Sequence, residues 1–378
     1  MLQPPSSIDQ LETCFERFKQ MRVSQPVSYD EAMQSWHLVC YQEVLQVLAD
    51  TSHFVPPRAH AGASPPTSST GPLFPPVAQR LLSQVLTPRS VSELTPRVKA
   101  MTHAILGQMR QAGTIDVIED FAAPLASSVL AELLGIPLEQ RASFLERVRA
   151  QRQGAAGEQV EEMPLLFRKL IAQRREQPQQ DLITALLTTS FDNALASDAD
   201  IEACLRWLVG MGYEMVTHLL GKTVLCLLLH PEVIERLHQD PAPIYSTIEE
   251  ALRFLPPVWR VTRMTTEEVA LGGQPIPAQA RICAWIVSAN RDDRYFSSPD
   301  AFDIERIPNR HLSFGHGHGF HFDTALARLL AEVSLTSLLD YLPDLKLLPD
   351  QRLEVVDHPA IFGVKHLYIT FSPTSVSR

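Results

Sequence analysis

The chain has 378 residues, 45% of them hydrophobic and 20% charged, enough to bury one large core or the cores of two or three ordinary domains. Its formal net charge of -10 is spread without long runs, which argues against nucleic acid or a membrane as a partner, because both need a basic face. No apolar stretch approaches the roughly 18 residues of a membrane span, and the N-terminus lacks the apolar region of a signal peptide. We therefore expect a soluble, cytoplasmic protein.

The N-terminal part alternates short helices with a hairpin. Apolar positions at helical spacing predict a helix over residues 8–22, and residues 27–40 are typical of a hairpin that precedes a second helix over 41–49. Residues 51–76 are crowded with Pro, Ser, Gly and Ala, so no regular element is expected there. A further helix is predicted over residues 77–86.

The middle of the chain is predicted to be helical. Residues 116–134 form a strong amphipathic pattern that ends at a Gly-Ile-Pro sequence, and the polar region 138–180 favours two short helices. Ser197 or Asp198 then caps a long helix that runs to Leu229 and is interrupted by two glycines.

The C-terminal part contains the predicted strands. Residues 260–264, 269–271, 276 and 281–287 alternate in the manner of strands, and residues 345–371 indicate a final hairpin. The sequence shows no internal repeat and no long low-complexity tract. The expected fold class is therefore mainly α with a smaller β region (α+β).

One loop, residues 311–328, has the strongest functional signal. It places Gly315, Gly317 and Gly319 at every second position, where the backbone can adopt positive φ and approach a flat partner closely. Four histidines fall within eleven residues, and an Ala/Leu-rich helical pattern follows at once. The loop therefore leads into a helix N-terminus.

This loop resembles the haem-binding loop of the cytochrome P450 family, Phe-Gly-x-Gly-x-His-x-Cys-x-Gly followed by Ala-x-Leu-Ala-Arg. Matched from Phe314 to Arg328, the family's thiolate cysteine falls on His321. None of the five cysteines lies after Cys283, so the loop has no other thiolate to offer. All five are scattered and without CxxC spacing, which indicates buried free thiols.

Three further motifs occur in the family's order. Residues 212–217 resemble the oxygen-binding kink, with the acid kept as Glu214 and the hydroxyl position occupied by Met215. Glu250 and Arg253 reproduce the family's Glu-x-x-Arg, which can form a buried ion pair. Residues 289–306 are similar to the family's meander, except that Ala301 replaces its usual arginine.

The resemblance covers residues 15 to about 371 and implies a single domain over 1–378, with loose termini at 1–14 and 373–378. It implies the family's triangular, helix-rich prism, in which a long central helix lies over the haem loop. The implied cofactor is haem b.

The resemblance assigns the site residues as follows. His321 is the expected iron ligand, and His318 is the runner-up. Arg263 is the expected propionate partner. The other residues expected near the haem are Phe314, Gly315, His316 and, as a substitute anchor, Arg80, whose alternative role is a solvated surface charge. Three of the family's anchors are replaced, by Pro75, Gln79 and Gly319, which should weaken haem retention. Asp323 is a candidate partner for the imidazole or a helix cap.

The replaced residues predict altered chemistry. An imidazole pushes less electron density toward iron than a thiolate, and Met215 cannot hydrogen-bond water usefully. Glu214 remains as a possible general acid/base, with a kink-stabilising carboxylate as the alternative. Classical monooxygenation is therefore expected to be impaired.

Three functions remain open at this stage. The first is a weak peroxidase- or peroxygenase-type oxidoreductase, or a binder of small ligands, with a His321–iron bond. The second is a haem-free binding or activator protein that recruits a partner enzyme, as some family members associated with glycosyltransferases do. The third is a conventional monooxygenase that acts on a hydrophobic small molecule with a ferredoxin-type electron donor.

Overall fold

The computed structural model describes residues 7–57, 76–152, 158–191, 194–316, 324–358 and 360–373. Internal contacts divide the chain into two compact units, and each unit joins segments that lie far apart in the sequence. Unit 1 contains residues 1–73, 221–321 and 347–367. Unit 2 contains residues 74–220, 322–346 and 368–378.

Unit 1 is built on a five-stranded sheet in the order β1-β2-β10-β7-β3. Its strands are β1 (Val27–Asp30), β2 (Ser35–Leu38), β3 (Phe54–Val55), β7 (Arg260–Thr265) and β10 (Arg281–Trp285). β1 and β2 form the predicted N-terminal hairpin, in which Val27 lies opposite Leu38. β10 runs parallel to β2 and antiparallel to β7. A separate hairpin pairs β8 (Val269–Leu271) with β9 (Gln274–Ile276).

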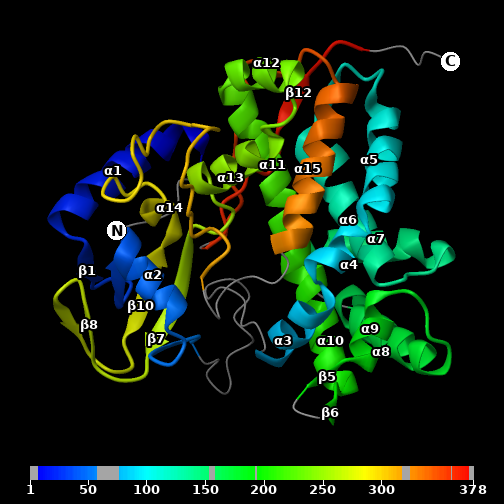
Figure 1. The fold of residues 1–378 in the computed structure, drawn as a ribbon, viewed down its shortest axis with the longest axis horizontal. Coiled ribbons are helices and arrows are strands. Elements are labelled where there is room, and N and C mark those ends of the chain that lie inside the picture. The colour runs from blue at the N-terminus through cyan, green and yellow to red at the C-terminus, as the bar shows by residue number, and fades with distance from the viewer. Residues whose placement is uncertain are drawn as a thin grey trace. The chain divides into compact units, whose positions relative to one another are not determined.

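Unit 1 also contains several helices. They are η1 (Ile8–Gln10), α1 (Leu11–Ser24), α2 (Tyr41–Ala49), α12 (Pro231–Gln239), α13 (Ile244–Phe254) and α14 (Ile286–Ala289). Figure 1 shows α2 and α14 beside β10. Phe18 of α1 packs on Trp285, with ring centroids 5.2 Å apart. The predicted strand over 281–287 ends at Trp285, because the chain turns there into α14.

Unit 2 is mainly helical. Its α-helices are α3 (Pro76–Val85), α4 (Pro88–Ser92), α5 (Thr95–Met109), α6 (Ala123–Leu133), α7 (Leu138–Arg152), α8 (Glu158–Glu176), α9 (Leu182–Thr188), α10 (Asp198–Trp207) and α15 (Thr324–Tyr341). Figure 1 shows α15 alongside α5, although more than 200 residues separate them. The small strands are β4 (Thr114–Asp116), β5 (Ser190–Phe191), β6 (Ala194–Leu195), β11 (Lys346–Leu347) and β12 (Tyr368–Thr370).

Two π-helical turns interrupt predicted α-helices in unit 2. The pattern over 116–134 contains the end of β4 and the turn η2 (Val117–Ala122) before α6 begins. Asp116 caps this turn by accepting a hydrogen bond from the amide of Ile118, over 3.0 Å. The long helix predicted from Ser197 is α10, the turn η3 (Leu208–Gly212) and then α11 (Tyr213–Leu229). π-turns of this kind often mark functional positions in helices.

The structure bears on two general expectations. None of the helices in the described residues is long and apolar enough to cross a membrane. All five cysteines are free, and four of them are buried, as predicted, whereas Cys14 is half-buried. Burial raises the pKa of the Cys14 thiol to about 11, which keeps it protonated and unreactive at neutral pH.

Candidate functional site

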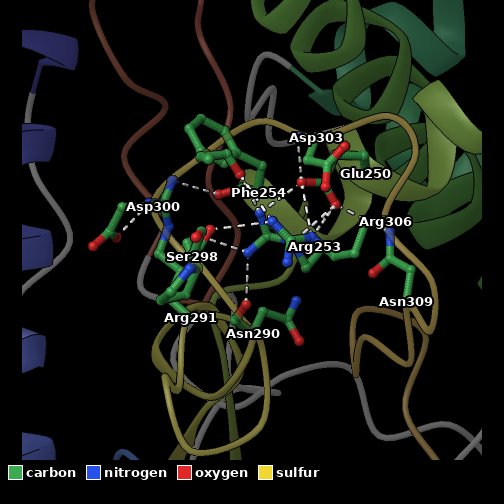
Figure 2. A network of polar contacts seen from close by, with 12 residues as sticks. Glu250, Arg253, Phe254, Asn290, Arg291, Ser298, Asp300, Asp303, Arg306 and Asn309 are labelled. Atoms are coloured by element: carbon green, nitrogen blue, oxygen red, sulfur yellow. Dashed lines mark hydrogen bonds and ion pairs between the residues drawn. The ribbon is translucent and has the colours of Figure 1, made fainter.

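An ion pair between Glu250 and Arg253 lies at the centre of a polar network in unit 1 (Figure 2). The two residues are nearly one turn apart on α13, and both side chains are completely buried. Arg253 donates from Nε and Nη2 to the two carboxylate oxygens, over 2.8 and 2.7 Å. This two-pronged geometry is typical of strong ion pairs, and the predicted pair is confirmed.

A second guanidinium, that of Arg306, also binds Glu250. Its Nε lies 3.2 Å from both carboxylate oxygens. The backbone amide of Asp303 and the side-chain amide of Asn309 donate to the same carboxylate, over 2.8 and 3.1 Å. Ala301 was expected to leave this segment without its arginine, and Arg306 supplies the guanidinium instead (Figure 2). The sequence analysis did not identify Arg306.

Arg253 also fixes the meander that precedes the loop. Its Nη1 donates to the carbonyls of Asn290 and Pro299, over 3.0 and 2.8 Å, and its Nη2 donates to the carbonyl of Ala301 over 2.8 Å. Buried carbonyls outside helices and strands need such partners, because an unpaired one is costly. One side chain of α13 therefore binds the irregular backbone of residues 290–301 at three carbonyls.

The start of the loop is attached to the same helix. Asn290 accepts a hydrogen bond from the amide of Leu312 through Oδ1, over 2.8 Å, and donates from Nδ2 to Ser313 Oγ over 2.9 Å. Ser313 Oγ in turn donates to the carbonyl of Leu252 on α13, over 2.6 Å. Residues 312–313 are thus fixed to α13 by side-chain hydrogen bonds.

Three of the predicted loop residues lie in the described part of the chain. Phe314 is buried, and Gly315 has a φ of 82°, the left-handed region that favours glycine. Its amide donates to the carbonyl of Leu312 over 2.9 Å, which closes a tight turn. His316 is exposed. His318 and His321 lie outside the described residues, as do Gly319 and Asp323.

Arg263, the expected propionate partner, is half-buried on β7 and opposite Ile282 of β10. Its Nη1 donates to the carbonyl of Thr262 over 2.9 Å. Among the described residues, no carboxylate lies within salt-bridge distance of Arg263. Burial lowers the pKa of its guanidinium, because removal from water disfavours the charged form. A half-buried cation of this kind is suited to an anionic ligand.

The anchors expected from α3 are only partly described. Arg80, the proposed substitute, is exposed on this helix, and Gln79 beside it is half-buried. Exposure is typical of the solvated surface charge that was the alternative for Arg80. Pro75, at the position of the family's histidine, lies outside the described residues.

The first turns of α11, in unit 2, carry a pair that the sequence analysis did not identify. His218 Nε2 lies 2.9 Å from the Oε2 of Glu214, the predicted acid. The Glu214 side chain is 26% exposed and that of His218 is 5% exposed. Positions four residues apart lie on the same face of a helix, so this spacing was a signal that the sequence offered.

Met215 occupies the family's hydroxyl position and is buried, so that position offers no hydrogen bond donor. The next hydroxyl along α11 is that of Thr217, which is also buried. Thr217 Oγ1 has no hydrogen-bond partner among the described residues, and the same is true of His218 Nδ1. Buried polar atoms of this kind usually meet ordered water or a ligand.

Comparison with known proteins identifies the family. The family model described as "Cytochrome P450" matches residues 244–341. "Cytochrome P450 109" of Bacillus spizizenii is 34% identical over 372 residues, which cover 93% of this chain and 90% of that relative. The chain belongs to the cytochrome P450 family. "Erythromycin C-12 hydroxylase" of Saccharopolyspora erythraea is 31% identical over 367 residues, covering 92% of this chain and 91% of the relative.

Solved cytochrome P450 structures have the same fold. A crystal structure of CYP109E1 from Bacillus megaterium in complex with testosterone matches with a TM-score of 0.85 and 29% identity, and covers 95% of this chain and 99% of that chain. The ligand-free structure of cytochrome P450 TbtJ1 matches with a TM-score of 0.88 and 29% identity, and the match covers 98% of this chain and 100% of that chain. The predicted fold, mainly α with a smaller β region, is confirmed.

Members of the cytochrome P450 family bind haem b. The described residues fit such a cofactor. Arg263 is a half-buried guanidinium without a described carboxylate partner, as a haem propionate requires. Leu312 is fixed to Asn290 and Ser313 to α13, directly before the family's ligand loop begins at Phe314. The sequence then offers imidazoles in place of a thiolate.

Proposed function

We propose that this cytochrome P450 is a haem b-dependent monooxygenase that oxidises a hydrophobic small molecule. The reaction inserts one oxygen atom of O2 into a C–H bond and reduces the other to water, with two electrons from a ferredoxin-type donor and two protons. Relatives named as a hydroxylase and an epoxidase support this reaction class. The observation that carries the proposal is the likeness to such relatives along more than nine-tenths of the chain.

The finer part of the proposal concerns the iron ligand, for which we assign His321. It occupies the position of the family's cysteine, and no cysteine follows Cys283. Imidazole is a common axial donor to haem iron in other protein families. His316, which is exposed, and His318 provide the comparison, because a mutation at either should leave the ligand in place.

The remaining roles follow from the described residues. When bound, the haem supplies oxygen activation and electron transfer. Arg263 would bind a propionate as a charge-assisted hydrogen-bond donor. Glu214 would donate and accept protons during oxygen reduction. The network around Glu250 would hold the meander and the start of the loop in place, as it does in the structure.

An imidazole donor favours a slower reaction than a thiolate donor, because it pushes less electron density toward the iron. The same feature favours a second candidate function, a peroxygenase that takes both its oxygen atom and its oxidising equivalents from hydrogen peroxide. The two functions differ in the oxidant that they use, so they can be measured on the same preparation.

The ligand is tested by absorption spectroscopy of the purified protein reconstituted with hemin. We expect one haem per chain, a Soret band typical of a histidine ligand, and a changed spectrum for His321→Ala. His316→Ala is the control and should keep the wild-type spectrum. An unchanged spectrum for His321→Ala would exclude His321 as the ligand. A chain that binds no hemin would favour the haem-free activator function instead.

The reaction is tested with a ferredoxin, its reductase and a panel of hydrophobic compounds. Testosterone and hexadec-9-enoic acid are suitable compounds to begin with. One solved relative is in complex with testosterone, and another is in complex with an acyl carrier protein that carries hexadec-9-enoic acid. We expect a hydroxylated product that carries oxygen-18 from labelled O2. Consumption of reducing equivalents with release of hydrogen peroxide alone would contradict monooxygenation. Product formed only from added peroxide would favour the peroxygenase.

A further inference from the structure

In this chain Glu214 pairs with the imidazole of His218, whereas the acid of the cytochrome P450 kink is accompanied by a hydroxyl. His218 Nε2 lies 2.9 Å from Glu214 Oε2, and in the part of the chain that the structure describes this carboxylate is the one charged group within salt-bridge distance of His218. The carboxyl end of the pair is partly exposed, and the imidazole end is almost completely buried. The pair therefore extends from a position that water can reach to one that is enclosed.

The opposite face of the same helix is apolar and closed. Gly212 and Val216 line a cavity of about 10 Å3 together with side chains of α6 and α15, which leaves room for about one water molecule. A helix advances by about 100° per residue, so Glu214 and His218 lie on the other side of α11 from this cavity. The polar pair is thus separated from the closed apolar packing of unit 2.

The second ring nitrogen of His218 lacks a partner. Nδ1 is buried and has no hydrogen-bond partner among the described residues, and Thr217 Oγ1 beside it has none either. When Glu214 is ionised, it accepts the proton on Nε2, and Nδ1 is a bare acceptor. When Glu214 is protonated, it can donate to Nε2, and Nδ1 then carries the proton. Nδ1 therefore changes from acceptor to donor according to the protonation of Glu214.

We propose that Glu214 and His218 form a proton relay on α11, in which His218 positions the carboxyl group of Glu214 and carries the proton onward. One proton passes from Glu214 Oε2 to His218 Nε2, while the proton on Nδ1 leaves to an acceptor on its buried side. The carboxylate then recovers a proton from water, and a turn of the imidazole ring returns the protonated nitrogen to the buried side before the next transfer. This proposal rests on the proposed function, because it supplies protons that oxygen reduction consumes. The relay takes the place of the hydroxyl that the family has at the position of Met215.

The two roles of His218 can be separated by choice of variant. In His218→Gln, the side-chain amide can still donate to Glu214, but it cannot carry a proton onward. In His218→Leu, both roles are lost. His238→Gln, at an exposed position at the end of α12, is the matched control for the same chemical change. Glu214→Gln removes the charge at the other end of the pair.

The first measurement does not depend on turnover. Nitrogen-15 NMR of imidazole-labelled full-length protein, with the signal of His218 assigned by through-bond correlation to its own backbone, reports the tautomer of His218. We expect Glu214→Gln to change the tautomer of His218, because an amide NH2 can donate to Nε2 where the carboxylate could only accept. An unchanged tautomer would overturn the pair. This comparison also decides the case in which the His218 variants fail to fold.

The second measurement compares two oxidants on the haem-loaded enzyme. With O2 and a ferredoxin, we expect His218→Gln to form product about tenfold more slowly and to release more hydrogen peroxide. With added hydrogen peroxide, which already carries two protons, we expect less than about a twofold change. Equal rates for His218→Gln and His238→Gln would overturn the relay. A wild-type enzyme that forms no product with either oxidant would contradict the proposed function, while the NMR result would still judge the pair.

Discussion

The buried network around Glu250 gives the sharpest test of how this fold is held. We consider the substitution Glu250→Gln, which keeps the size of the side chain and removes its charge. The carboxylate accepts hydrogen bonds from both guanidiniums, from the amide of Asp303 and from Asn309. An amide has one acceptor oxygen, so its NH2 group would face donors whichever way it is turned. Arg253 and Arg306 would also lose their shared counter-ion.

The expected magnitude follows from burial. The Glu250 and Arg253 side chains are 0% exposed, and that of Arg306 is 5% exposed. Removing one partner of a buried ion pair typically lowers the free energy of unfolding by about 3–5 kcal/mol, because the remaining charge stays buried and unpaired. Arg306→Met should cost less, about 1–3 kcal/mol, because the pair of Glu250 and Arg253 remains neutral.

The assay is urea unfolding followed by far-UV circular dichroism, with the slope m compared between variants. Glu93→Gln is the matched control, since the ion pair of Glu93 with Arg89 spans 3.6 Å and its side chains are 66% and 90% exposed. This variant should change the free energy of unfolding by less than about 0.5 kcal/mol. A loss below about 1 kcal/mol for Glu250→Gln, at unchanged m, would refute the assignment of a buried counter-ion.

Three further predictions concern other buried cations and a buried histidine. Burial lowers the pKa of His37 to about 4, so the stability that depends on its neutral form is present above about pH 6.5 and is lost as the pH falls toward 4. The wild type should therefore lose about 2 kcal/mol more than His37→Gln between about pH 7 and pH 5, measured by urea unfolding at each pH. Lys222 is fully buried, its Nζ donates to the carbonyl of Pro256, and burial lowers its pKa. Lys222→Met should therefore raise the melting temperature, and it should raise the free energy of unfolding by about 1–4 kcal/mol. An unfolding midpoint at or below that of the wild type would contradict this. Arg263→Gln should speed transfer of hemin to apomyoglobin about tenfold, whereas Arg281→Gln, at an exposed position on β10, should leave it unchanged.

The fold could be predicted well where local signals act alone. Helix α2 begins and ends where the apolar pattern predicts, and Ser197, one of the two predicted caps, caps α10 in a capping box with Asp200. The predicted start of the helix over 116–134 was wrong, because β4 and a π-turn precede α6, and a single π-turn of six residues is too short to show a period of its own. Ile286 and Val287 resemble a strand in composition, but the chain leaves the sheet after Trp285.

The candidate site was predictable where its partners are close in sequence. Glu250 and Arg253 are three residues apart on one helix, and the structure pairs them as expected. Arg306 follows 56 residues later on a segment without regular structure, and sequence spacing does not show which arginine of such a segment reaches Glu250. His218 was missed for a different reason. It lies four residues after Glu214, a spacing that allows a pair on one helix face, but the family's motif places a hydroxyl at the position of Met215 and no histidine at that of His218.

The changes at His321, Met215 and His218 are chemically connected. An axial ligand that pushes less electron density toward the iron leaves cleavage of the oxygen–oxygen bond more dependent on protonation. A chain with an imidazole ligand therefore depends more strongly on a proton relay. The dependence on His218 should therefore shrink when His321→Cys restores a sulfur ligand. We expect His218→Gln to slow O2-driven product formation about tenfold in the wild type and less than about threefold in the His321→Cys background, as a double-mutant cycle measures. Equal losses in both backgrounds would show that ligand and relay act independently.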